Sequence, residues 1–185
     1  MRYMQTGGFQ NNPSMRLTLG LTMVLLLGFT ATNFFLYFAR MDLSPASVVS
    51  YYNGSEEEFR PARSYQSMLE VTHSHLAMMA VVMLLLTHLV VFAPFRRSQK
   101  ITIIVTAFMS ALLSEGAAWL VRFVHPGFAV LKVAAFVALQ TSLLFLLGSL
   151  AAFLWSGRRR QKGMEEVILA GETEEELAEE EEHLP

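Results

Sequence analysis

The sequence predicts an all-α integral membrane protein: an antiparallel four-helix bundle with a disordered acidic C-terminal tail. The chain has 185 residues, of which 53% are hydrophobic, and its mean hydropathy is +0.39. Charged residues make up 16% of the chain, whereas soluble domains carry about 25%. Four apolar runs are long enough to cross a hydrocarbon core, which takes about 20 helical residues. Because lipid offers the backbone no hydrogen-bond partners, we expect each run to be a helix.

The expected helices form one membrane domain, residues 1–163. A basic segment containing Pro94 separates the second helix from the third, and His125-Pro126-Gly127 predicts a tight hairpin between the third and the fourth. The long loop after the first helix contains turn signals. Its residues 48–52 are expected either to form a short amphipathic helix on the bilayer or to belong to an ordered cap. The expected helices are 17–39, 68–92, 101–124 and 128–155, and the loop is 40–67.

Charge is distributed unevenly along the chain. Residues 164–185 contain ten of the sixteen acidic residues, and their mutual repulsion predicts a largely disordered or transiently helical cytoplasmic tail. Lys and Arg in short loops are retained on the cytoplasmic side of a membrane. We therefore expect both termini in the cytoplasm and the loop 40–67 outside, in a bacterial inner membrane. The basic residues expected on the cytoplasmic side are Arg2, Arg16, Arg96, Arg97, Lys100, Arg158, Arg159, Arg160 and Lys162.

The chain contains no cysteine. Iron–sulfur clusters and the covalent attachment of c-type haem both need cysteine, so both are excluded. The sequence also has no glycine-rich phosphate loop and no motif that indicates nucleic-acid binding. Its chemistry is therefore expected from histidines and carboxylates.

The second expected helix carries Glu70, His73, His75 and His88. An ionisable group near the bilayer centre costs roughly 2.5 to 3.5 kcal/mol on insertion scales, so such groups indicate function. At about 100° per residue, Glu70 and His88 share a direction and His73 lies about 60° from each. His75 points nearly opposite to His73. Both histidines also have structural alternatives. His73 would cap the helix or hydrogen-bond to the outer loop, and His88 would be an uncharged side chain that hydrogen-bonds to a neighbouring helix.

Further polar residues are expected near the outer half of the bundle: Glu115, Arg122 and His125 in or after the third helix, and Lys132 in the fourth. These charges have a purely structural explanation: Glu115 forms an ion pair with Arg122 or Lys132, because buried charges tend to pair. The functional alternatives are a proton-accepting carboxylate beside a quinone, or haem propionates held by Arg122 and Lys132.

Two histidines at the separation of His73 and His88 resemble the pattern of dihaem cytochromes b. No second helix supplies a matching pair of ligands, so we expect at most one haem b, held by His73 or His75 together with His125. Imidazole and carboxylate ligands also suit zinc, iron or copper, and the ligand types alone do not choose the metal. Glu70 and Glu115 are the candidate proton-transfer groups.

Four segments carry a family resemblance. They resemble a sparsely characterised group of small four-helix bacterial membrane proteins associated with cytochrome-rich respiration. The resemblance covers about residues 45–155. It implies a respiratory setting and supports the grouping of Glu70, His73, His75 and His88. The segments are Tyr51-Tyr52-Asn53-Gly54, Leu69-Glu70-Val71-Thr72-His73-Ser74-His75-Leu76, Leu86-Thr87-His88 and Val121-Arg122-Phe123-Val124-His125-Pro126.

The leading functional prediction is a membrane redox subunit that is cytochrome b-like or interacts with a quinone. It would pass electrons between the quinone pool and an outer-side partner, with other membrane or periplasmic redox subunits as partners and in an oligomer or complex. An accessory or assembly subunit without its own cofactor is the second hypothesis. A small oligomeric transporter or metal permease is the third, because four helices are few for alternating access.

Overall fold

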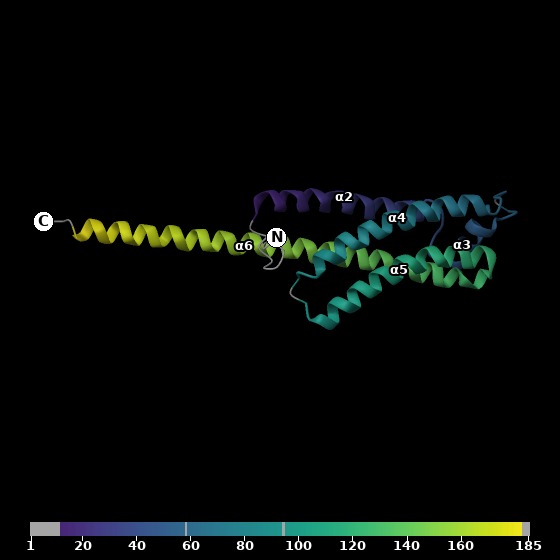
Figure 1. Ribbon diagram of the computed structural model, residues 1–185. Coiled ribbons are helices and arrows are strands. Elements are labelled where there is room, and N and C mark those ends of the chain that lie inside the picture. Colours follow the sequence, from purple (N-terminus) through teal and green to yellow (C-terminus); the bar gives the residue numbers. More distant parts are fainter. Residues whose placement is uncertain (1–11, 58, 94, 183–185) are drawn as a thin grey trace. The chain divides into compact units, whose positions relative to one another are not determined.

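The computed structural model describes the backbone of residues 12–57, 59–93 and 95–182, and the side chains as far as residue 155. Helices account for nearly all of it (Figure 1). No β-strand occurs in these residues, and a single bridge joins Ser55 to Arg60. The elements are α2 (Pro13–Phe38), α3 (Pro45–Asn53), α4 (Tyr65–Val90), α5 (Arg97–Phe123), the short 3-10 helix η2 (Pro126–Phe128) and α6 (Ala129–Glu182).

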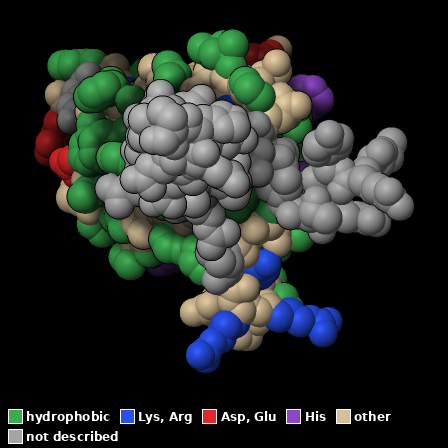
Figure 2. Space-filling model, turned by 90° about the vertical axis from the view of Figure 1, so that its left-hand side faces the viewer, with side chains coloured by type: hydrophobic (Ala, Val, Ile, Leu, Met, Phe, Trp, Pro, Cys, Tyr) green, Lys and Arg blue, Asp and Glu red, His purple; other side chains and the backbone are tan. Residues whose placement is uncertain are grey.

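Within the described residues, four helical segments are long and apolar enough to cross a membrane: α2, α4, α5 and Pro126–Trp155. This confirms the predicted all-α membrane fold with four spans. Figure 2 views the molecule from the end at which α4 and α5 are joined, and it shows apolar side chains around the sides with Lys and Arg side chains gathered at the lower tip. The exposed Arg96 ends that α4–α5 connection, and the exposed Arg97 begins α5.

The chain divides into two compact units. The first consists of the N-terminal residues to Leu21 and the C-terminal residues from Ala151. In it, the backbone of residues 164–182 is helical as the last part of α6, where the sequence predicted a tail either largely disordered or transiently helical. Glu, Leu and Ala, which dominate this stretch, are strong helix formers, and their propensity continues the helix that the membrane span begins. His183 lies outside the described residues.

The second unit, Thr22–Leu150, contains the bundle. Near the start of α4, Thr72 accepts a hydrogen bond from Trp119 Nε1 near the end of α5 at 2.9 Å, so these two helices run antiparallel. The ring of Tyr37 at the end of α2 stacks on Phe136 near the start of α6, with centroids 3.6 Å apart. The interior of this unit is filled along the spans by large, fully buried side chains, which include Met83, Leu86, Leu139, Leu143 and Leu146.

The helix α3 caps one end of this bundle. Ser44 accepts a hydrogen bond from the backbone N–H of Ser47, and Pro45 opens the helix, which is a strong N-terminal signal. Val48 is fully buried, and Tyr51 and Tyr52 are buried with it in a core cluster shared with α5. The 48–52 segment is therefore helical, and its apolar side chains pack on the bundle as the cap interpretation predicted.

Gly54 ends α3 with a φ of 86°. A Cβ at this position would lie 2.7 Å from the carbonyl oxygen of Arg60, so both the backbone conformation and the lack of space require glycine. After the turn, the backbone N–H of Arg63 donates to the carbonyl of Tyr52 at 2.9 Å. This bond brings Arg63 back beside α3.

Candidate functional site

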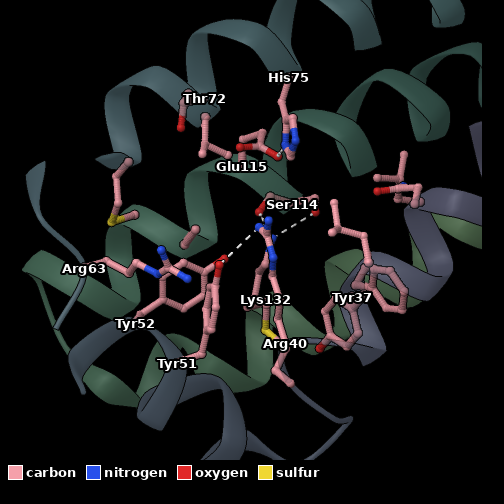
Figure 3. Close-up of a pocket in the computed structure, with 18 of the residues that line it drawn as sticks. Tyr37, Arg40, Tyr51, Tyr52, Arg63, Thr72, His75, Ser114, Glu115 and Lys132 are labelled. Atoms are coloured by element: carbon pink, nitrogen blue, oxygen red, sulfur yellow. Dashed lines mark hydrogen bonds and ion pairs between the residues drawn. The ribbon is translucent and has the colours of Figure 1, made fainter. Parts of the chain in front are cut away.

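A cavity of about 150 Å³ lies at the α3 end of the bundle, between side chains from every element except η2 (Figure 3). Twelve of its twenty lining residues have polar side chains. The polar side chains are three cations, Arg40, Arg63 and Lys132; the pair His75 and Glu115; the hydroxyl groups of Tyr37, Tyr51, Tyr52, Ser67, Thr72 and Ser114; and Asn33. Apolar lining residues, among them Met79 and Leu139, close its deeper side.

His75 and Glu115 meet across the α4–α5 interface. The Nδ1 of His75 lies 2.9 Å from Oε1 of Glu115, and the two side chains are 38% and 12% exposed. An ionised carboxylate only accepts, so with Glu115 in that form Nδ1 carries the proton of this bond, and Nε2 is the ring nitrogen that can meet a ligand. An imidazole held by a carboxylate in this way is an arrangement that suits proton exchange.

Lys132 is 6% exposed and reaches across from α6 to α5. Its Nζ donates to the carbonyl oxygen of Ser114 at 2.7 Å and to the Ser114 hydroxyl at 3.3 Å. The predicted ion pair of Glu115 with Arg122 or Lys132 is absent from the described contacts. Glu115 binds His75 instead, and Arg122 Nε donates to the carbonyl oxygen of Arg63 at 2.8 Å, because Arg122 lies about two turns farther along α5.

The two arginines of the cavity gather around one tyrosine. A guanidinium nitrogen of Arg40 donates to the Tyr51 hydroxyl at 3.2 Å, and the guanidinium carbon of Arg63 lies 4.4 Å from the centre of the Tyr51 ring. A cation over the face of an aromatic ring, such as Arg63 over Tyr51, is attracted to it because the ring face is electron-rich. Next to it, burial raises the pKa of the Tyr52 phenol, and the neighbouring Tyr51 and Glu115 add to the effect. Tyr52 is therefore a neutral hydrogen-bonding group at neutral pH.

A second hollow of about 220 Å³ adjoins the cavity between α2 and α4. Its lining is mostly apolar, with Phe29, Leu36, Met78 and Met79, and the hydroxyl of Thr32 bonds back to its own helix. We call it the α2–α4 groove. Four residues line both spaces: Asn33, Leu36, His75 and Met79. A polar cavity and an apolar groove therefore meet at His75.

The other histidines and Glu70 lie elsewhere. Glu70 is exposed and accepts a hydrogen bond from Gln66 at 3.0 Å, and His73 is exposed too. His88 is exposed near the far end of α4 with its ring edge-on to Phe92. His125 is exposed at the hairpin, where its Nδ1 accepts from the backbone N–H of Gly127 at 2.9 Å.

The structure thus selects among the predicted site residues. His75, Glu115 and Lys132 line the cavity, and Arg122 supports it through Arg63, whereas Glu70, His73, His88 and His125 do not line it. As predicted, His75 faces away from His73, but it is the His75 side of the helix that faces the interior. In the described part of the chain, no three His, Cys, Asp or Glu side chains form a group that could hold a metal ion.

Among the lining residues that were not predicted from the sequence are Arg40, Tyr51, Tyr52 and Arg63. All four belong to the connection between the first two spans. The available signals were the paired tyrosines next to Asn53-Gly54 and two arginines among acidic neighbours. Neither signal identifies a partner helix. The sequence therefore predicted a short helix or a cap for the two tyrosines and a loop for the two arginines, and it named none of the four as site residues.

Comparison with known proteins gives one match. A protein-family model described as a transmembrane helical domain matches residues 42–162, which include α3, α4, α5 and the membrane span of α6. No curated protein matches the chain significantly. No solved structure does so either.

Proposed function

The chain belongs to the family of this transmembrane helical domain, and from that premise we propose that it is a quinone-interacting subunit of a membrane redox system. The observation that supports the proposal is the junction at His75 between a polar cavity and an apolar groove. A membrane quinone has the same two parts, a planar head with two carbonyl oxygens and an apolar isoprenoid tail. The head would occupy the cavity and the tail the α2–α4 groove.

The cavity offers what a quinone head needs for binding. Carbonyl oxygens accept hydrogen bonds, and donors are available from Nζ of Lys132, from the phenol of Tyr52 and, when the ring is doubly protonated, from Nε2 of His75. Small-molecule sites typically combine an apolar lining with a few polar groups that fix the orientation of the ligand. Met79, Leu139 and Phe136 supply the apolar part.

The His75–Glu115 pair would exchange the protons. Conversion of a quinone into a quinol takes two electrons and two protons, one proton for each carbonyl oxygen. The doubly protonated ring of His75 gives its Nε2 proton to the nearer oxygen and is reprotonated through Glu115, which lines the same cavity. Nζ of Lys132, on the opposite helix, gives the second proton to the other oxygen and is reprotonated from the cavity. The electrons come from a partner redox subunit, and in the reverse direction they go to it. Under this proposal the protein works in a complex.

Binding of a short-tailed quinone to the detergent-purified full chain, measured by titration calorimetry, tests the proposal. We expect His75→Ala to weaken binding about tenfold or more, which corresponds to about 1.4 kcal/mol for lost head contacts. Met78→Trp, which fills the groove at a residue that does not line the cavity, should weaken binding of the tailed quinone more than that of the bare head. Leu84→Trp is the matched control, because Leu84 is exposed on α4 and lines neither space.

Absence of binding in the wild-type protein contradicts the proposal. So does binding that neither His75→Ala nor Met78→Trp alters. If the protein instead copurifies with a larger membrane complex and binds no quinone, the accessory-subunit hypothesis replaces the quinone one.

A further inference from the structure

The cavity has an excess of positive charge. Arg40 follows α2, Arg63 precedes α4 and Lys132 lies in α6, and all three line the cavity with a single carboxylate, Glu115. Glu115 is already bound to His75. Among the described residues, none of the three cations forms an ion pair with a carboxylate; they donate to a phenol hydroxyl, a backbone carbonyl and a serine hydroxyl, or face an aromatic ring.

These contacts leave donor capacity unused. Lys132 has three hydrogens on Nζ, and Ser114 accepts two of them. Arg40 has five N–H donors and gives one to Tyr51. Buried charges are stabilised in proteins when they are paired. Lys132 is among the most buried polar residues that the structure describes, at 6% exposure. The one carboxylate of the lining, Glu115, is shared between this ammonium and His75, so the three cations leave the cavity with a net positive charge.

We infer that the cavity binds an amphiphile whose head carries a negative charge, and that Arg40, Arg63 and Lys132 form its anion subsite. Figure 3 shows these three side chains entering the cavity from separate elements, below the His75–Glu115 pair. For a quinone, the charged head is the reduced form that has lost one proton. This identification rests on the proposed function, whereas the preference for an anion rests on the charges alone.

The charge preference can be measured without any ligand. The chain has no cysteine, so single cysteines can be introduced directly. Ser67→Cys places a thiol in the cavity lining, and Ala46→Cys places a reference thiol on the exposed side of α3. Each variant is treated with a sulfonate-bearing and with a trimethylammonium-bearing methanethiosulfonate of similar size. A cleft lined by charges of one sign concentrates ions of the opposite sign about tenfold or more.

We expect the ratio of anionic to cationic reaction rates to be about tenfold higher at Ser67→Cys than at Ala46→Cys. Adding Arg63→Gln should reduce that ratio, whereas Arg97→Gln, an exposed arginine at the other end of the bundle, should leave it unchanged. Equal ratios at the two thiols overturn the inference. Failure of both reagents at Ser67→Cys also overturns it, because a cavity closed to ions cannot select them.

The ligand class is tested with a matched pair of probes. A short-tailed hydroxynaphthoquinone is ionised at neutral pH, and its methyl ether is neutral and of nearly the same shape. We expect the ionised probe to bind about tenfold more tightly than the ether, and Arg40→Gln to remove that preference. Arg40 is an exposed residue, so this variant is expected to fold where Lys132→Met is at risk of unfolding.

The outcomes separate the proposal that the protein binds a quinone from the inference that the cavity holds an anion. If both probes bind equally well, the protein binds quinones and the anion inference fails. If neither probe binds while phosphatidic acid does, and the thiol at position 67 favours the anionic reagent, the anion subsite stands and holds a phospholipid head instead of a quinone. If phosphatidic acid and both probes fail to bind, the anion inference is overturned together with the proposed function.

Discussion

Nδ1 of His75 on α4 lies 2.9 Å from Oε1 of Glu115 on α5, and this contact joins two spans beside the cavity. A double-mutant cycle with His75→Ala and Glu115→Ala measures its contribution. Both side chains keep some exposure, so we expect a coupling free energy of about 1 kcal/mol from thermal unfolding in detergent. A coupling near zero would show that the two residues do not interact in the folded protein.

The three histidines of α4 are expected to behave differently in ligand binding. His75 lines both the cavity and the α2–α4 groove, whereas His73 and His88 are exposed and line neither. Under the quinone proposal, His75→Ala weakens binding about tenfold, and His73→Ala and His88→Ala change the Kd less than about twofold. A large effect of His73→Ala would place the site on the opposite face of α4.

Gly54→Ala tests the turn that follows α3. The φ of 86° opposes a side chain, and so does the carbonyl oxygen of Arg60, which would lie 2.7 Å from the added methyl carbon. We expect the free energy of unfolding to fall by about 1 to 3 kcal/mol. Gly116→Ala is the control, since nothing lies within 4 Å of its Cβ and alanine favours a helix by about 0.5 to 1 kcal/mol. Equal effects of the two substitutions would contradict this account.

Alkaline pH is expected to destabilise the cap through Tyr52. Burial raises the pKa of this phenol in the folded protein, so the unfolded chain releases the proton first. The associated stability is fully present below the usual tyrosine pKa of about 10 and is lost as the pH rises above it. Thermal unfolding followed between neutral pH and pH of about 11 should show this loss, and Tyr52→Phe should show a smaller one. An identical pH profile for the wild-type protein and Tyr52→Phe would rule out Tyr52 as the cause of the loss.

The prediction of haem b is tested by an absorption spectrum of the purified protein. A haem held by His75 and His125 gives a Soret band that His125→Ala removes and His73→Ala leaves in place. A haem held by His73 and His125 reverses the roles of His73 and His75. A spectrum without a Soret band, in protein purified from cells that make haem, removes the prediction.

Helix periodicity and apolar length were sufficient to predict the fold. The four spans, the hairpin at His125 and the opposite directions of His73 and His75 all follow from regular helix geometry. The inward face of α4 could not be predicted in the same way, because a membrane helix is apolar on its lipid side as well as on its packed side. The periodicity separated His75 from His73 without showing which of them faces the bundle.

The cavity itself was predicted only in part. Glu115 and Lys132 stood out because charges are costly inside a span. Arg40 and Arg63 did not, since charged residues in a polar loop are ordinary. Their place in the cavity depends on α3 folding back on α5 and on Arg63 bonding to the Tyr52 carbonyl, which are contacts between residues distant in the sequence or outside any regular repeat.

The backbone bonds around Arg63 also make the adjacent turn a suitable place for a reporter. Arg63 is held by the carbonyl of Tyr52 on one side and by Arg122 of α5 on the other, so its position is set by helices. Ser55 and Arg60 exchange two backbone hydrogen bonds at the base of the turn, and Glu56 and Glu57 lie exposed beyond them. An epitope or a small fluorescent group inserted between Glu56 and Glu57 would report on the sidedness of the membrane without entering the bundle.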